Sequence, residues 1–411
     1  MIKKKQTFIY IGRFYPQNLL KTLKEDSRGK AGGMSNHNFE MSIINGLCHQ
    51  KDITFKCLTF PGVYSYPYNN KRLFTKKELY AYKSTTIYSI GFCNLPIVKE
   101  IWATISLSIQ IIRFSRQINA DRINIIINTP SQNILNAVKI AKLLSRKKIT
   151  QTVIIPDIPS MVTSMTKTNY IKGKLLNLMH SSLMRKLSSV NGLVLLTDDM
   201  LDFISNKSIK HIIMEGIVDV ETMSQETVCE ESRQEVILYT GTLLKMFGIM
   251  NLVRAFQKIE NDSIQLWLCG AGDSVREIEE AAKVDKRIKF YGLVDSRTAL
   301  HLQRQATILV NPRTSEGEYT KYSFPSKTIE YLLAGKTVII NRLKGIPKEY
   351  FEYAFTPEDE SVDALANCIM NVIQLNYDVR LEKAMAGRNF VISNKNSQVQ
   401  VSRILEMITS Y

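Results

Sequence analysis

Short runs of β-branched apolar residues alternate along the chain with longer segments in which apolar residues recur at helical spacing. This alternation is typical of parallel sheets with helices on both faces. In the first half it predicts strands at residues 7–11, 54–60, 86–90, 123–127, 151–155 and 192–196. The second half repeats the pattern, with strands at 235–239, 264–269, 288–291, 308–311 and 337–341 and helices at 249–259 and 275–282.

Two separate βα repeats predict two domains, and a chain of 411 residues is long enough to give each domain its own core. The repeats meet near residues 216–219, where a strand-like run ends and a charged, poorly periodic stretch begins. We therefore predict an α/β protein with two Rossmann-like, doubly wound parallel-sheet domains facing across a cleft. Residues 1–216 form the first domain and 217–385 the second, and a helix within 386–411 packs back on the first.

The net charge of +16 is concentrated in the first half of the chain. Residues 1–216 hold 31 Lys and Arg against 12 Asp and Glu, a net of +19, which leaves 23 against 26, or −3, for residues 217–411. An excess of this kind indicates an anionic partner for one domain, such as nucleic acid, a membrane surface or a phosphorylated substrate. A generally lysine-rich composition is the alternative explanation.

Two basic segments of the first half could supply that surface. Residues 64–83 interleave aromatic and cationic side chains in an expected loop, which suits nucleic acid or a lipid headgroup boundary. Residues 166–187 predict an amphipathic basic helix, which suits a membrane surface or a packed helix with a solvated face. The longest apolar stretch, residues 101–112, is shorter than the about 20 residues that span a bilayer, so we expect any membrane contact to be peripheral.

The most informative stretch runs from Asn311 to Ile340 and predicts a strand, a polar loop, a helix beginning at Pro325 and another strand. The first turn of such a helix directs free N–H groups toward a ligand, which suits a diphosphate. Lys327 and Arg313 add positive charge, and the carboxylate of Glu330 can accept hydrogen bonds from both hydroxyls of a ribose. The alternative is that these residues only begin and end an ordinary helix, and that Glu330 interacts only with the helix dipole.

This stretch and four others resemble the C-terminal half of glycosyltransferase family 4, the retaining GT-B group. They are LYTGTL at 238–243, FGIMNLVRAF at 247–256, LWLCGAGD at 266–273, IKFYGLV at 288–294 and the block 318–340. In the first half, AGGMSNHNFEMSIINGL resembles the family's glycine loop. The TKYSFPSK and AGK variants are similar to those of bacterial capsule, exopolysaccharide and O-antigen enzymes.

The resemblance implies a nucleotide-sugar donor in the second domain and an acceptor in the first. It places the family's ribose-binding glutamate at Glu330, and its other glutamate falls on Tyr322. The Arg and Lys that bridge the donor diphosphate fall on the uncharged Thr242 and Phe247, so Lys245, Arg313, Lys321 and Lys327 are the candidates to replace their charge. The expected donor site comprises Gly241, Thr242, Lys245, Gly270, Arg313, Lys321, Tyr322, Ser323, Phe324, Pro325, Ser326, Lys327 and Glu330.

In the first domain the expected glycine loop comprises Gly32, Gly33, Met34 and Ser35. Asp157 follows a strand in the sequence PDIPSM and could orient a sugar hydroxyl or cap the next turn. His37 is the one histidine near the expected site. With Lys327, these two residues are the catalytic candidates. We expect no cofactor, since no ligand cluster with metal spacing stands at a strand end, and the family is described as retaining without a metal.

The expected activity is transfer of a sugar from a nucleotide donor, with UDP as the expected nucleotide, to a lipid-linked oligosaccharide in cell-surface polysaccharide synthesis, with retention at the anomeric carbon. The expected partners are the nucleotide sugar, a polyprenyl-diphosphate-linked glycan and an anionic membrane surface, without nucleic acid. The expected location is the cytoplasm, at the inner face of the cell membrane. A nucleotide-sugar 2-epimerase on the same fold and a non-catalytic partner subunit of another transferase are the alternatives.

Overall fold

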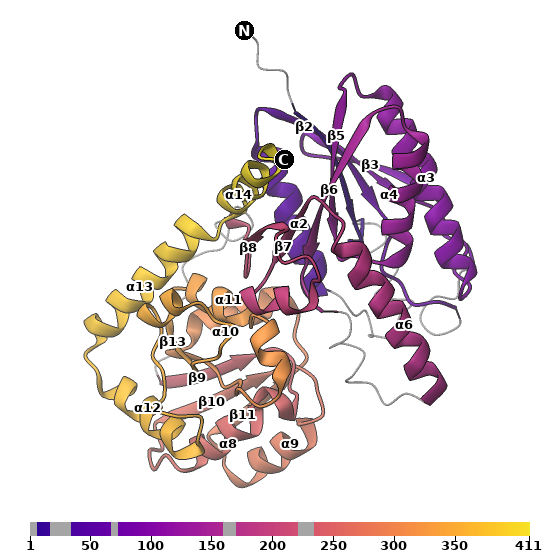
Figure 1. Ribbon diagram of the computed structural model, residues 1–411. Coiled ribbons are helices and arrows are strands. Elements are labelled where there is room, and N and C mark those ends of the chain that lie inside the picture. The colour runs from indigo at the N-terminus through magenta and orange to yellow at the C-terminus, as the bar shows by residue number, and fades with distance from the viewer. Residues whose placement is uncertain (1–5, 17–33, 67–72, 159–169, 221–233) are drawn as a thin grey trace. The chain divides into compact units, whose positions relative to one another are not determined.

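The computed structural model of the protein describes residues 6–16, 34–66, 73–158, 170–220 and 234–411 (Figure 1). The chain divides into two compact units: unit 1 is Met1–Asp219 with Ser397–Tyr411, and unit 2 is Val220–Asn396. The first boundary lies close to the predicted one. The second lies at 396/397 instead of 385/386, because helix α13 (Tyr377–Asn394) continues without a break through the predicted boundary.

Unit 1 contains an eight-stranded sheet in the order β3-β4-β2-β1-β5-β6-β7-β8. Its strands are β1 (Gln6–Gly12), β2 (Ile53–Thr59), β3 (Glu78–Tyr82), β4 (Thr85–Ser89), β5 (Arg122–Asn128), β6 (Lys148–Ile155), β7 (Gly192–Leu195) and β8 (Lys210–Ile213). All neighbouring pairs are parallel except β3 with β4. The core strands β1 and β5 are buried on both faces, which explains their continuous apolar runs.

Strand β3 corrects one expectation, because residues 78–82 were predicted as part of a loop. This segment pairs antiparallel with β4 at the edge of the sheet, from Glu78 opposite Ser89 to Tyr82 opposite Thr85. An edge strand is only partly buried, so its side chains alternate between half-buried and exposed positions and carry little apolar signal in the sequence.

The helices of unit 1 are α2 (Met34–His49), α3 (Val98–Gln117), α4 (Gln132–Leu144), α6 (Tyr170–Leu187), the 3₁₀ helix η1 (Asp198–Phe203) and α14 (Ser397–Thr409). The C-terminal helix α14 packs on α2 through Val401 and Ile404, which share a core with Ile43 and Leu47. The contact is close at Gly46, where a Cβ atom would lie 2.2 Å from the carbonyl oxygen of Ser397. A residue larger than glycine would force the two helices apart.

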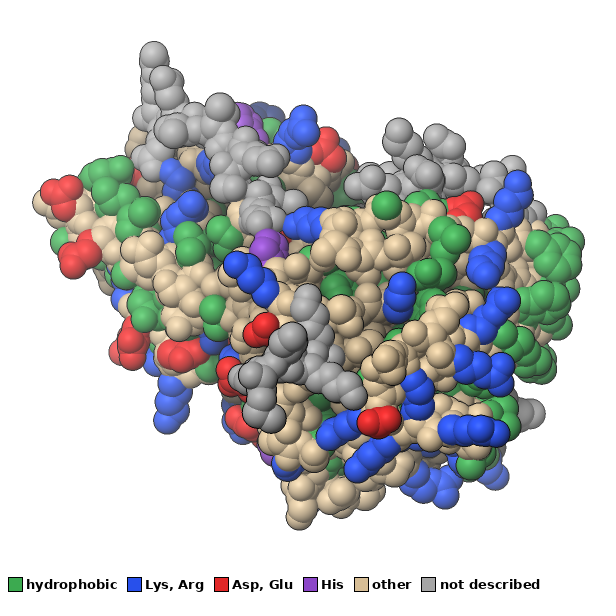
Figure 2. All heavy atoms as spheres, turned by 90° about the horizontal axis from the view of Figure 1, so that it is seen from above, with side chains coloured by type: hydrophobic (Ala, Val, Ile, Leu, Met, Phe, Trp, Pro, Cys, Tyr) green, Lys and Arg blue, Asp and Glu red, His purple; other side chains and the backbone are tan. Residues whose placement is uncertain are grey.

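Helix α3 packs on α4 through one face, yet its opposite face is also apolar. Ile101, Trp102, Ile105 and Ile109 are each about half exposed, although they belong to the longest apolar stretch of the sequence. Hydrophobic side chains gather beside lysine and arginine side chains at the right-hand edge of Figure 2, the side on which α3 lies in Figure 1. No helix in the described ranges has an apolar run long enough to cross a membrane.

Unit 2 contains a five-stranded, wholly parallel sheet in the order β11-β10-β9-β12-β13. Its strands are β9 (Glu235–Thr240), β10 (Ile264–Cys269), β11 (Ile288–Gly292), β12 (Ile308–Asn311) and β13 (Thr337–Ile340). Its helices are α8 (Ile249–Gln257), α9 (Val275–Val284), α10 (Ser296–Gln305), α11 (Lys327–Leu333), α12 (Val362–Gln374) and α13, with 3₁₀ helices η2 (Lys245–Phe247), η3 (Glu318–Tyr322) and η4 (Lys348–Glu352).

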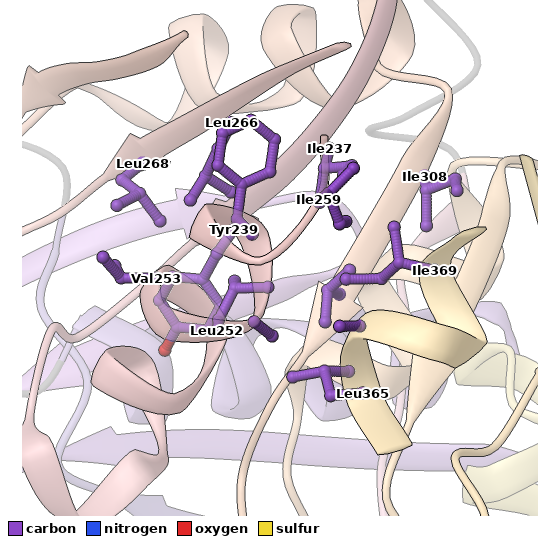
Figure 3. Packing of buried hydrophobic residues seen from close by; sticks show 14 of the residues in the cluster. Ile237, Tyr239, Leu252, Val253, Ile259, Leu266, Leu268, Ile308, Leu365 and Ile369 are labelled. Atoms are coloured by element: carbon purple, nitrogen blue, oxygen red, sulfur yellow. The ribbon is translucent and has the colours of Figure 1, made fainter. Parts of the chain in front are cut away.

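In unit 2, α8, α9 and α12 lie on one side of the sheet and α10, α11 and α13 on the other (Figure 1). Figure 3 shows the first side, where Leu252 of α8 and Leu365 and Ile369 of α12 meet the strand residues Ile237 and Leu266. The two parallel sheets with helices on both faces confirm the predicted α/β class.

Both sheets have a topological switch point, where the strand order changes direction. It lies between β1 and β5 in unit 1 and between β9 and β12 in unit 2. Ligands of open α/β sheets bind beyond the carboxyl ends of the strands at such points. The polar side chains that gather at the two switch points therefore define the candidate site of each unit.

Candidate active site

Two glycine turns bring the loops after β9 and β10 into contact. The φ angles of Gly241 and Gly270 are 152° and 145°, and a Cβ atom on Gly270 would lie 1.7 Å from the carbonyl oxygen of Gly241. A Cβ atom on Gly241 would lie 3.5 Å from Cε of Lys327. The missing side chains therefore let the two loops approach closely, with Tyr239 and Lys327 beside the Gly241 turn.

Glu330, in the first turn of α11, lies at the centre of a polar cluster beyond the switch point of unit 2. Nζ of Lys327 donates to both of its carboxylate oxygens, at 2.7 and 2.8 Å. Nε2 of Gln303, at the end of α10, donates to Glu330 Oε1 at 2.6 Å. Lys327 and Glu330 are both half-buried, so the carboxylate is held in place but still reachable from solvent.

Gln303 was not predicted as a site residue. Its side chain is fully buried, and Nε2 also donates to Oγ1 of Thr240 at 2.8 Å, while Oε1 has no hydrogen-bond partner among the described residues. Tyr331 completes the network, because its hydroxyl accepts from Thr240 N at 2.8 Å and donates to Thr240 O at 3.1 Å. The end of β9 is thus tied to α10 and α11. No motif in the sequence marks Gln303, because it lies in an ordinary amphipathic helix.

Arg313 follows β12 and lies between two aromatic rings. Its guanidinium carbon is 5.1 Å from the ring centre of Phe247 and 4.9 Å from that of Tyr319, and Nη2 donates to Oγ of Ser323 at 2.8 Å. No carboxylate pairs with it in the part of the chain that the structure describes, and its Nε has no hydrogen-bond partner there. Stacking on two rings fixes a planar cation in one orientation.

Arg313 and Glu330 act in opposite directions on the ionisation of the Tyr239 hydroxyl. Burial raises the pKa of the Tyr239 hydroxyl well above its ordinary value, while Arg313 lowers it and Glu330 raises it. Burial also raises the pKa of Cys269, at the end of β10, to about 12, and the charge of Lys327 opposes that shift. The ends of β9 and β10 therefore lie within the field of these charged groups.

Lys245 and Thr242 lie apart from this cluster. The ammonium of Lys245 forms an ion pair with Glu277 of α9, which raises the pKa of Lys245, and its backbone N–H donates to Oδ1 of Asp273 at 2.8 Å. Thr242 is exposed, and its carbonyl oxygen accepts from the Tyr239 hydroxyl at 3.0 Å. Lys245 is therefore paired with a carboxylate outside this cluster, whereas Lys327 is paired with Glu330 within it.

The other predicted donor residues lie in the loop between β12 and α11. Tyr322 is buried, and the ammonium of Lys321 lies 4.7 Å from the centre of its ring. Phe324 and Pro325 are buried, and Phe324 packs on Tyr350. Ser326 is exposed at the N-cap of α11, which has only seven residues, so its dipole contributes less than that of a long helix.

In unit 1, the predicted His37 lies on α2, where its Nδ1 accepts from the backbone N–H of Tyr15 at 3.3 Å. Burial lowers its pKa, which favours the neutral imidazole. Asp157 is exposed just beyond β6. Met34 and Ser35 begin α2, whereas Gly32 and Gly33 lie outside the described residues.

Glu40 is the centre of a second polar cluster that sequence reasoning missed. It is fully buried beside the end of β1, where its carboxylate accepts from Arg13 N at 3.0 and 3.1 Å, from Tyr10 at 3.3 Å and from Asn36 at 3.1 Å. Asn36 in turn accepts from Asn128 and Thr129, at 3.4 and 3.2 Å. The available signal in the sequence was the i,i+4 spacing of Asn36 and Glu40 in NHNFE, because residues four apart on a helix are neighbours.

Burial raises the pKa of Glu40 to about 7, and hydrogen bonding, led by the backbone N–H of Arg13, opposes that shift. Oδ1 of the fully buried Asn128 has no hydrogen-bond partner among the described residues. The cluster lies at the β1/β5 switch point and holds both an ionisable group and an unsatisfied acceptor. Within the described ranges, no group of three His, Cys, Asp or Glu side chains is arranged to hold a metal ion.

Comparison with known proteins bears on the family and on the fold. Residues 234–374 match the family model described as glycosyl transferases group 1. The matched segment lies within unit 2 and contains every predicted donor-site residue. No curated protein matches the chain by sequence.

Solved structures share the fold of the whole chain. Anabaena HepE in complex with UDP is 13% identical with a TM-score of 0.60, and the match covers 99% of this chain and 100% of that one. A glycosyltransferase from Rickettsia africae is 15% identical with a TM-score of 0.60, covering 98% and 97%. The lipopolysaccharide outer core galactosyltransferase WaaB is 13% identical with a TM-score of 0.59, covering 98% and 99%. Identities this low show the fold alone, which is GT-B.

The GT-B fold and the matched segment together support the glycosyltransferase superfamily for this chain. The match to the family model is confined to unit 2, so the assignment rests on the donor half.

Proposed function

We propose that the protein is a retaining glycosyltransferase of family 4 that moves a sugar from a UDP-sugar to a lipid-linked oligosaccharide in cell-surface polysaccharide synthesis. The observation that carries the proposal is the Lys327–Glu330–Gln303 cluster beside the glycine turn that follows β9. Anabaena HepE has been solved in complex with UDP and with UDP-glucose, which supports the choice of UDP.

In this proposal the carboxylate of Glu330 receives the two ribose hydroxyls of the donor. Lys327, which holds that carboxylate in the structure, lies beside the Gly241 turn and is placed to meet the β-phosphate as negative charge develops there. Arg313 supplies the second cation. Charged groups that are already oriented stabilise a departing diphosphate because little reorganisation is needed during the reaction.

This arrangement replaces the charge that the family places at Thr242 and Phe247. Phe247 instead supplies one of the two rings that orient Arg313, so a cation that follows β12 replaces one that the family has after the first strand of this domain. Lys245, also a candidate, is paired with Glu277 and has a smaller part in the proposal.

The acceptor half of the proposal rests on unit 1. The buried cluster of Glu40, Asn36 and Asn128 at its switch point is the proposed support of the acceptor pocket, with His37 and Asp157 at its edge. We further propose that no metal is required, that the enzyme works in the cytoplasm at the inner face of the membrane, and that the growing glycan is carried on a polyprenyl diphosphate.

Replacing Glu330 with alanine tests the donor site. The loss of two charge-assisted hydrogen bonds should weaken UDP-sugar binding about a hundredfold, measured by titration calorimetry. Glu280→Ala, which removes an exposed carboxylate paired with Arg276 in the same unit, is the matched control and should bind normally. Unchanged binding by a folded Glu330→Ala protein would refute the site, and product formed without acceptor would indicate an epimerase instead. A wild-type protein that binds no nucleotide would indicate a partner subunit.

A further inference from the structure

The exposed face of α3 and the segment before β3 form one continuous apolar surface on unit 1. A groove of about 290 Å³ lies between them, lined by Phe74 and Lys77 on one side and by Trp102, Ile109 and Arg113 of α3 on the other. The groove joins the aromatic and basic segment 64–83 to a helix that sequence reasoning had not connected with it. We call this surface the α3 face and define it by Phe74, Ile97, Ile101, Trp102, Ile105 and Ile109.

The α3 face is unusual because it is apolar and exposed although the opposite side of the helix already packs in the core of unit 1. Ala103, Leu107, Ile111 and Phe114 fill the core side and are buried, so burial of the helix in unit 1 does not require the isoleucines on the other side. Ile101 and Ile105 are 58% and 53% exposed, and Phe74 is 63% exposed. A contiguous exposed apolar surface on a folded protein marks an interaction site.

The start of α3 carries a further feature. Ile97, the N-cap residue, has a φ of 66° and a side chain that is 76% exposed. A β-branched residue rarely adopts this left-handed backbone, and such strain is retained where the surrounding structure or the function requires it. The effect here is to add an isoleucine to the stripe formed by Ile101 and Ile105.

The charges around the α3 face identify its partner. Lys76 and Lys77 precede β3, and Arg113 and Arg116 continue the exposed side of α3 beyond Ile109. No carboxylate is paired with these four within the described ranges; Glu78 and Asp121 are the acidic residues nearest to them in sequence, and Glu100 lies in the first turn of α3. An apolar stripe with a tryptophan, bordered by cations, suits the boundary between the headgroups and acyl chains of an anionic bilayer.

We propose that the α3 face is the surface by which the protein docks on anionic lipid, with its isoleucines and Trp102 among the first methylenes and its four cations at the phosphates. The proposal names the surface that binds the membrane partner of the proposed function. It rests on the proposed function only for the reason that the protein should bind a membrane. The predicted basic helix, α6, is the weaker candidate, because its Leu183 and Leu187 are buried and Lys186 donates to amide oxygens of α4.

Sedimentation of the full chain with vesicles of phosphatidylglycerol and phosphatidylethanolamine tests this docking, with phosphatidylcholine vesicles as the neutral comparison. Ile101→Ser/Ile105→Ser should lower the partition coefficient about tenfold for each isoleucine at any salt concentration. Lys76→Ala/Arg113→Ala should lower it about fivefold for each cation at low salt and much less at high salt.

The matched control is Val284→Ser/Val379→Ser, which changes two exposed apolar residues of unit 2, 83% and 50% exposed. It should leave the partition coefficient unchanged. All variants should keep the wild-type melting temperature and UDP-sugar affinity, because the substituted side chains lie on the surface and outside the donor site.

Equal partition of the isoleucine variant and wild type would overturn the proposal, as would equal binding to neutral and anionic vesicles. Dimerisation that Ile101→Ser/Ile105→Ser abolishes, without any vesicle binding, would assign the face to a second copy and also overturn it. The proposed function is tested separately by UDP-sugar binding, which needs no lipid. Failure of docking with intact donor binding would therefore leave the donor site unaffected.

Discussion

Gln303 should act as a positioning residue for Glu330, and Gln303→Met tests this without a large change in volume. The substitution removes the hydrogen bond to the Glu330 carboxylate at 2.6 Å and the bond to Thr240 Oγ1 at 2.8 Å. A bond to a charged group contributes about 1.5–3 kcal/mol and a neutral bond about 1 kcal/mol. The loss is partly offset, because the buried Oε1 of Gln303 has no partner and such an atom costs about 1–3 kcal/mol.

The free energy of unfolding should therefore fall by only about 1 kcal/mol in Gln303→Met, because Thr240 keeps Tyr331 as a neighbour and Glu330 keeps Lys327. Donor affinity should respond more clearly. A Glu330 side chain that has lost one of its two partners is less restrained, so ordering it further when the donor binds should cost about 1 kcal/mol, and the Kd for a UDP-sugar should rise about fivefold.

Titration calorimetry of a double-mutant cycle separates this role from general destabilisation. If Gln303 acts through Glu330, adding Gln303→Met to Glu330→Ala should weaken donor binding no further than Glu330→Ala alone. Gln303→Glu should weaken binding more than Gln303→Met, because it places a second carboxylate against Glu330. Additive losses in the double variant, or donor binding unchanged by Gln303→Met, would refute the reasoning.

Three further predictions concern other parts of the two units. Gly270→Ala should lower the free energy of unfolding by about 3 kcal/mol in urea titrations, because its Cβ would lie 1.7 Å from a backbone oxygen of the β9 loop. Gly292→Ala, where a Cβ meets nothing within 4 Å, should cost only about 1–2 kcal/mol for its φ of 66°, and equal losses would contradict the clash. Burial raises the pKa of Glu40 from an ordinary 4.5 to about 7, so the folded state binds the proton more tightly. The free energy of unfolding should fall by about 3 kcal/mol as pH rises through this range, and Glu40→Gln should flatten the profile; a flat wild-type profile would exclude a buried acid of this kind. Arg313→Lys should weaken UDP-sugar binding about tenfold in calorimetry, because an ammonium cannot stack as a plane between two rings, whereas unchanged affinity would show that charge alone suffices.

The apolar pattern by itself determined the strands and their class of sheet. Strands β1, β5, β9 and β10 are buried on both faces, so their residues are continuously apolar and the runs are visible in the sequence. The edge strand β3 was missed because only part of it is buried. Motif spacing also singled out Lys327 and Glu330, which lie three residues apart on one helix and must therefore be neighbours.

Only the tertiary structure decided which groups surround those residues. Gln303 meets Glu330 because α10 and α11 pack beside the end of β9, and nothing in the local sequence encodes that contact. The same packing gives Lys245 a carboxylate partner on α9 and places Arg313 between two rings. The apolar stretch at 101–112 was visible from the start, but which of its residues face the core depends on how α3 packs on α4. A sequence records which side chains are present, whereas their partners depend on distances between elements far apart along the chain.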